Sequence, residues 1–310
     1  MLSGGRLFHG DGTGAALQKG EQTMKGSDNP AAFNAYLEGE RLFSVTDKDQ
    51  MAEARQRFEM AISLDPDFAR AWGYLSYATV RSVLVGWLDR AELRHAEHCA
   101  KMAVHLGPDD YTNHWDLAFV YQNTGRLDEA VEQYEMARRL YDHYTDKLER
   151  KPGLLAEMAV AYVQAGEHKK AIELGEKAQL IPHWYRWNTG YAYYMAKDYD
   201  KAIQQFGLMN FGKNRLANRY YVPEMELFIA AAYAMRAKGQ KGKAAASDQR
   251  EAGDAMERFK RAMKIRPFGK GRLTRSDVEQ RRCFKKKSDQ AHWLEGLRQA
   301  GLWDQDNAED

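Results

Sequence analysis

The chain has 310 residues, of which 44% are hydrophobic and 29% charged, and its formal net charge is +2. This balance is typical of a folded protein in water and differs from that of disordered or fibrous chains. No stretch approaches the ~20 apolar residues that a membrane-spanning helix needs, and two cysteines are too few for a disulfide framework or a zinc finger. Because no signal peptide is visible either, we expect a cytoplasmic protein.

The small net charge conceals an uneven distribution. Residues 236–287 contain 18 Lys or Arg and 6 Asp or Glu, a local excess of 12 positive charges, so the rest of the chain carries a net charge of −10. The sequence therefore predicts an acidic main part followed by a basic C-terminal part.

A pattern of small and aromatic residues recurs along the chain. One copy reads Leu117-Ala118-x-x-Tyr121-x-x-x-Gly125-x-x-x-x-Ala130-x-x-x-Tyr134-x-x-Ala137, and another begins Met158-Ala159-x-x-Tyr162-x-x-x-Gly166. Small residues are needed where two antiparallel helices cross, since larger side chains would hold the backbones apart. A recurrence of this kind, with a period of roughly 20–50 residues, indicates a solenoid of stacked helix pairs.

Taken in chain order, residues 1–29 are glycine-rich and predict a flexible leader, and residues 30–267 predict six helix pairs. The second pair carries about eight extra residues at 83–93, and the sixth about thirteen at 238–250, for which we predict a mobile surface loop. Residues 268–310 predict a basic linker, a helix near 289–299 that covers the open face of the last repeat, and an acidic tail.

These residues resemble the tetratricopeptide repeat over most of residues 31–267. The resemblance implies an all-α, right-handed superhelical solenoid of about six helix pairs with a C-terminal capping helix. More narrowly, residues 55–72, 184–194 and 293–302 resemble the repeat region attached to bacterial class III adenylate/guanylate cyclases and to ToxR/CadC-type regulators. The chain has neither the cyclase catalytic domain nor the winged helix, so a signalling role is implied by resemblance only.

In this repeat family, the first helix of each pair lines the concave face. The resemblance therefore implies an aromatic groove that binds a peptide or an amphipathic helix, because aromatic rings dominate binding hot spots. The candidate partner-binding residues are Tyr77, Trp115, Phe119, Gln122, Trp184, Trp187, Tyr191 and Tyr194. The alternative is that these rings pack against neighbouring helices or are covered by the C-terminal segment.

Two other kinds of site were considered. The basic run Arg281, Arg282, Lys285, Lys286 and Lys287 could bind an anionic partner or nucleic acid. The alternatives are a solvated linker and a strip that docks against the acidic part of the array. His95, His98 and Cys99 have helical spacing that could suit a metal, but histidines on helices are common without one. We predict no metal site, no cofactor and no catalytic residue.

The sequence thus predicts a non-catalytic protein–protein interaction module, such as an adaptor, scaffold or regulatory protein. The alternatives are binding of nucleic acid or another anionic partner through the basic C-terminal region, which we consider the weaker option, and self-assembly into a homo-oligomer. The partner is expected to be another protein.

A first prediction concerns chaperone tails, which tetratricopeptide domains hold through a lysine/asparagine clamp. The corresponding pairs here are Tyr36/Glu40, Gly73/Tyr77, Trp115/Phe119, Ala156/Val160 and Trp187/Tyr191. Because none of them offers a lysine or asparagine, we expect no heat in titration calorimetry with an acidic peptide that ends in a free carboxylate. Tight binding of such a peptide would contradict the prediction.

Overall fold

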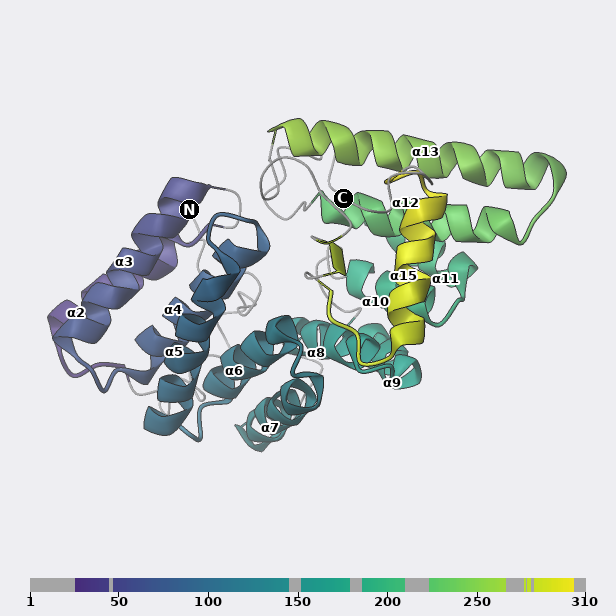
Figure 1. Ribbon diagram of the computed structural model, residues 1–310. Helices are drawn as coiled ribbons and strands as arrows, with labels where there is room; N and C mark the ends of the chain where they lie inside the picture. The colour runs from purple at the N-terminus through teal and green to yellow at the C-terminus, as the bar shows by residue number, and fades with distance from the viewer. Residues whose placement is uncertain are drawn as a thin grey trace. The chain divides into compact units, whose positions relative to one another are not determined.

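The computed structural model describes residues 26–44, 47–144, 152–178, 186–209, 223–265, 276, 278–279 and 282–303 (Figure 1). Regular secondary structure in these residues is helical throughout. The prediction of an all-α fold built from helix pairs is therefore confirmed. The predicted leader lies outside the described residues up to residue 25, as does the acidic tail after residue 303.

The chain divides into two compact units, residues 1–154 and 155–310. In the first unit, three helix pairs follow one another: α2 (Pro30–Leu42) with α3 (Lys48–Leu64), α4 (Ala69–Leu84) with α5 (Leu93–Leu106), and α6 (Tyr111–Thr124) with α7 (Leu127–Tyr144). The extra residues of the second pair contain a short 3-10 helix, η1 (Arg90–Glu92).

The second unit contains three further pairs and one terminal helix. The pairs are α8 (Pro152–Gln164), which begins at the unit boundary, with α9 (His168–Lys177), α10 (Arg186–Met195) with α11 (Tyr199–Gly207), and α12 (Glu224–Lys238) with α13 (Gly242–Ile265). The terminal helix α15 spans Lys287–Gln299. No described helix is long and apolar enough to cross a membrane.

Side chains that precede the helices explain where several of them begin. Asn29 accepts hydrogen bonds from the backbone N–H groups of Ala31 and Ala32, and Asp47 does the same for Asp49 and Gln50 at the start of α3. Such caps satisfy N–H groups that lack a partner within the helix. At the C-terminal end of α6, Gly125 takes the left-handed conformation with φ +83°, which favours glycine.

Within each unit, glycine allows paired helices to approach closely. In α10, a Cβ atom at Gly190 would lie 2.7 Å from Cδ1 of Phe206 in α11, and still closer to Cε1. The same relation joins Gly39 of α2 to Phe58 of α3, where the distance from a Cβ to Cε1 would be 2.6 Å. The predicted rule that small residues mark the helix crossings thus applies in both units.

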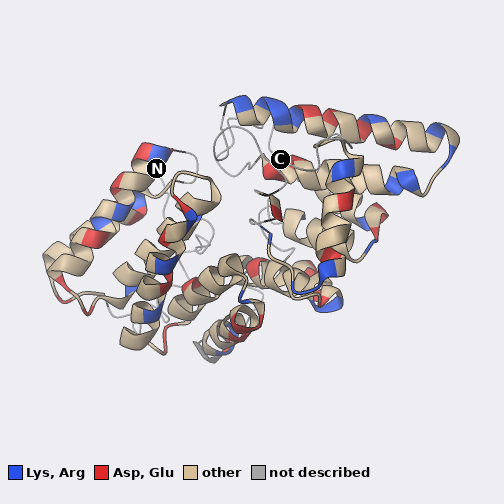
Figure 2. Ribbon diagram, viewed as in Figure 1, with Lys and Arg blue, Asp and Glu red and all other residues tan. Residues whose placement is uncertain are grey.

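The prediction of a mobile loop at residues 238–250 is wrong. The turn between the last two paired helices is short, and residues from Gly242 onward form the first turns of α13. Asp248 accepts two hydrogen bonds of 2.7 Å from Arg236 of α12, and its side chain is 7% exposed. The alanine and lysine residues in this stretch favour a helix, and the ion pair fixes it against α12. Charges of both signs follow one another along α13 (Figure 2).

The position of the terminal helix also differs from the expected one. We expected it to cover the open face of the last pair, but its principal contacts are with α12 and α10, the first helices of the last two pairs (Figure 1). It therefore lies over the aromatic residues that were predicted to bind a partner.

A second prediction tests the glycine crossings. Replacing Gly190 with Ala should lower the free energy of unfolding of the second unit by about 1–3 kcal/mol, because the buried Phe206 ring cannot move aside without strain. Gly253→Ala in α13 is the matched control, since a Cβ there meets nothing within 4 Å, and it should raise stability by about 0.5–1 kcal/mol. Urea unfolding followed by circular dichroism measures both, and equal effects would contradict the packing.

Candidate functional site

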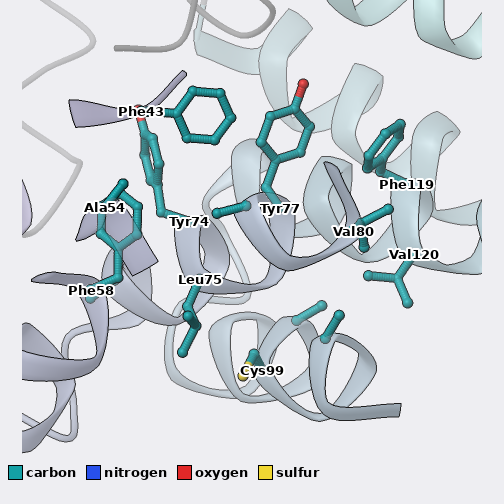
Figure 3. Packing of buried hydrophobic residues seen from close by; sticks show 14 of the residues in the cluster. Phe43, Ala54, Phe58, Tyr74, Leu75, Tyr77, Val80, Cys99, Phe119 and Val120 are labelled. Atoms are coloured by element: carbon teal, nitrogen blue, oxygen red, sulfur yellow. The ribbon is translucent and has the colours of Figure 1, made fainter. Parts of the chain in front are cut away.

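The four candidate residues of the first unit lie in its interior. Tyr77 of α4 stands between Phe43 and Phe119, with ring centroids 5.7 and 5.1 Å away (Figure 3). Trp115 is fully buried, and Gln122 accepts a 2.9 Å hydrogen bond from the hydroxyl of Tyr134. These side chains hold α4, α6 and α7 together. Their burial agrees with the alternative, packing between helices, and their role in binding a partner stays a prediction.

In the second unit, the candidate residues form what we call the aromatic face. It consists of Trp187, Tyr191 and Tyr194 on α10, together with Phe228 on α12, which the sequence analysis did not single out. The Tyr191 and Phe228 ring centroids are 4.7 Å apart, and those of Trp187 and Phe228 are 5.7 Å apart. Trp184 lies outside the described residues.

The terminal helix α15 covers the aromatic face through Trp293. Its ring stacks on Phe228 with centroids 4.6 Å apart and an interplanar angle of 26°. The centroids of Tyr194 and Tyr191 lie 5.8 and 6.4 Å from that of Trp293. Because Trp293, Tyr191, Tyr194 and Leu297 are each at most 1% exposed, the aromatic face is filled by the chain's own helix.

Gly296 permits this close contact. A Cβ atom at this position would collide with the hydroxyl oxygen of Tyr194 and lie 3.1 Å from Cβ of Ala231 in α12. The backbone of α15 therefore sits directly against α10 and α12 one turn after Trp293. Glycine inside a helix is less stable than alanine. Its presence at position 296 is therefore explained by the close packing of the helices.

Polar contacts hold α15 and the residues before it at several points. The backbone N–H of Lys285 donates to the carbonyl oxygen of Gln164, and Nζ of Lys286 donates to that of Gly166, both at 2.8 Å. Nε2 of His168 lies 3.1 Å from a carboxylate oxygen of Asp289. Near the far end of the helix, Lys238 donates to Glu295 at 2.9 Å. The terminal helix is thus fixed by contacts with α8, α9, α10 and α12.

The basic run is only partly available to an external anion. Arg282 packs over the rings of Trp187, Tyr191 and Phe228 and lies 3.3 Å from a carboxylate oxygen of Glu224. The side chains at 285–287 are exposed, although the lysine at 286 makes the carbonyl contact described above. Arg281 lies outside the described residues.

Burial shifts the pKa values of three groups in this site toward the uncharged form. Burial raises the pKa of the Tyr191 and Tyr194 hydroxyls above the ordinary value of tyrosine. Burial also lowers the pKa of His292, and Lys197 contributes to the lowering, although a hydrogen bond with the carbonyl of Tyr194 opposes it. On the outer side of α15, hydrogen bonds from Arg298 above all lower the pKa of Glu295 to about 2. The contact is therefore apolar at its centre and ionic at its edge.

The cysteine and histidines of α5 have a structural explanation. Cys99 is fully buried with Sγ 3.5 Å from Nε2 of His95, and the His98 ring packs edge-on against Trp72. Burial raises the pKa of the Cys99 thiol to about 12, so the thiolate that a metal requires is disfavoured. Within the described part of the chain, no three His, Cys, Asp or Glu residues are arranged to hold a metal ion.

Sequence reasoning identified three rings of the aromatic face and gave cover by the C-terminal segment as an alternative, but it did not single out Phe228 or Trp293 for this contact. It assigned the helix near 289–299 to the open face of the last repeat. One signal was present: a glycine lies three residues after Trp293 and directly before Leu297, and a small residue inside an apolar stripe marks a close helix contact. Arg282 gave no such signal, because its partners come from two distant helices.

A third prediction separates the ring of Tyr191 from its hydroxyl. Tyr191→Ala should lower the free energy of unfolding of the second unit by about 3–5 kcal/mol, as expected for a large buried aromatic residue. Tyr191→Phe is the matched control and should be neutral or stabilising by up to about 1 kcal/mol, since the buried hydroxyl has no hydrogen-bond partner among the described residues. A large loss in the Phe variant, measured by urea unfolding, would contradict this assignment.

Comparisons with known proteins place this geometry in context. A family model, "Tetratricopeptide repeat", matches residues 115–142, most of the α6/α7 pair. No curated protein sequence matches the chain. Similar solved structures include TTC0263, a thermophilic TPR protein of Thermus thermophilus (19% identity, TM-score 0.49, 61% of this chain and 97% of that one). They also include YrrB, a TPR protein with an unusual peptide-binding site (17% identity, TM-score 0.43, 67% and 96%).

A third structure, that of the APC/C hetero-tetramer Cut9-Hcn1, has a TM-score of 0.54 at 20% identity and covers 75% of this chain and 43% of the other. At this identity the likeness concerns the fold alone. The family model identifies a tetratricopeptide repeat at residues 115–142, and the structural likeness shows that the helix pairs around it have the same kind of fold.

Proposed function

We propose that the chain is a non-catalytic protein-interaction module whose aromatic face binds an amphipathic helix. The observation that carries the proposal is the position of α15, which places the indole of Trp293 on Phe228 and buries Leu297 in the same contact. Because α15 fits this surface, we expect a partner helix to share its features. These are an apolar stripe, a glycine that allows close approach, and charged residues on the outer side.

In this proposal, α15 is a tethered occupant that a partner helix replaces. A tethered ligand acts at an effective concentration that can be on the order of millimolar. A partner must therefore bind more tightly than α15, or α15 must first be weakened. The polar contacts at the edge of the helix, such as Lys238 with Glu295, are exposed enough to be exchanged at little energetic cost.

The alternative functions have weaker support. Binding of nucleic acid or another anionic partner would rely on the exposed lysines at 285–287. The lysine at 286 already donates to the carbonyl of Gly166. This alternative stays a prediction. Self-assembly could use the exposed apolar residues of the first helix pair, which are Phe33, Leu37, Met60 and Leu64. Single apolar residues on a surface are common in monomers. The signalling role implied by the cyclase-like repeat segments also stays a prediction.

A fourth prediction tests the proposal with one methyl group. In the full chain, Gly296→Ala should prevent docking of α15, because the new Cβ collides with Tyr194. A labelled peptide of residues 278–303 should then bind this variant at least tenfold more tightly than the wild-type chain, as measured by fluorescence anisotropy. A peptide that itself carries Gly296→Ala should be more helical by circular dichroism, since alanine favours helices, yet bind at least tenfold more weakly.

Gly253→Ala in the full chain is the control and should bind the peptide as the wild type does. A second full-chain variant, Trp293→Ala with Leu297→Ala, removes two buried apolar side chains of α15 and leaves the aromatic face on α10 and α12 unchanged. It keeps the test decisive if Gly296→Ala does not fold. The proposal is wrong if folded variants of both kinds bind no peptide, because α15 is then a permanent part of the core.

A further inference from the structure

The side chain of Arg282 occupies a separate position beside Trp293 on the aromatic face. Its Cζ atom lies 5.2 Å from the ring centroid of Phe228, 5.6 Å from that of Tyr191 and 5.7 Å from that of Trp187. The side chain is 13% exposed. A cation within about 6 Å of an aromatic ring is attracted by the ring's quadrupole, and here three rings act on the same cation.

A further contact of Arg282 supplies a negative charge. A carboxylate oxygen of Glu224, at the start of α12, lies 3.3 Å from Nη2. Nε is buried and has no hydrogen-bond partner among the described residues. Arginine suits this combination better than lysine, because a planar guanidinium stacks on rings while its edge donates to a carboxylate.

We infer that Trp187, Tyr191, Phe228 and Glu224 form an arginine-binding subsite, filled by Arg282 in the absence of a partner. The inference rests on the proposed function and narrows it: the partner segment carries an arginine shortly before its amphipathic helix. In this chain, the arginine precedes the first residue of α15, Lys287, by five positions.

The geometry also sets a spacing between the two anchoring side chains. Phe228 contacts both Arg282 and Trp293, with distances of 5.2 and 4.6 Å from its ring centroid. The two residues are eleven positions apart in the sequence. A partner must therefore place a guanidinium and a large aromatic ring against the same phenylalanine, which makes the distance between them a determinant of specificity.

The fifth prediction measures this subsite with peptides of residues 278–303 that bind the full-length Gly296→Ala chain. Arg282→Ala in the peptide should weaken binding at least tenfold, and Arg282→Lys at least threefold, because lysine keeps the charge but loses the stacking. The control peptide Arg298→Ala should bind within twofold of the wild-type peptide, since that guanidinium pairs with Glu295 of the same helix. Anisotropy titrations at one ionic strength give all four affinities.

A change on the protein side completes the test. Glu224→Gln, added to the Gly296→Ala chain, should weaken the wild-type peptide but leave the Arg282→Ala peptide unaffected, which is the signature of a direct pair in a double-mutant cycle. An Arg282→Ala peptide that binds within twofold of the wild-type peptide overturns the subsite and leaves the proposed function intact. Equal weakening of both peptides by Glu224→Gln would also overturn the subsite and leave the proposed function intact. If no peptide binds either of the variants designed to release α15, both proposals are wrong.

Discussion

The stacking of Trp293 on Phe228 is the contact on which the arrangement of the second unit depends. With centroids 4.6 Å apart and both rings at most 1% exposed, it joins the terminal helix to the last helix pair and encloses Tyr191 and Tyr194. Aromatic residues bury large areas and therefore dominate both cores and interfaces. In this structure the surface is part of the core, and in the proposed function it becomes an interface when α15 is displaced.

Two small residues make that contact possible. Gly296 lets the backbone of α15 approach Tyr194, and Ala231 of α12 lies opposite it. The helix pairs use the same principle, as at Gly190 against Phe206. Close backbone approach between helices is therefore the common construction rule of this chain, whether the helices belong to one pair or, like α15, come from a distant part of the sequence.

The ionic contacts of the site have different weights. Arg282 with Glu224 is mostly enclosed and adjoins three rings, whereas Lys238 with Glu295 lies at the surface. Exposed ion pairs contribute little to stability. The pairs at the edge of α15 therefore orient the helix, and its buried apolar side chains supply most of the stability of the contact. The pair of Arg236 and Asp248 is also mostly enclosed, and it fixes the first turns of α13 against α12.

The sequence by itself determined the helix pairs, because each pair needs small residues at its crossings and a turn between its helices, and both are local signals around Gly125 and Gly166. It also indicated that Trp187, Tyr191 and Tyr194 share one helix face. It could not determine what covers them. Only the tertiary structure places Trp293 and Arg282 on that face. Contacts between side chains more than 50 residues apart in the sequence depend on shape and burial, for which no local pattern exists. The error at residues 238–250 has a different cause: glycine, serine and lysine in this stretch suggest a loop, and the ion pair of Asp248 with Arg236 favours the helix.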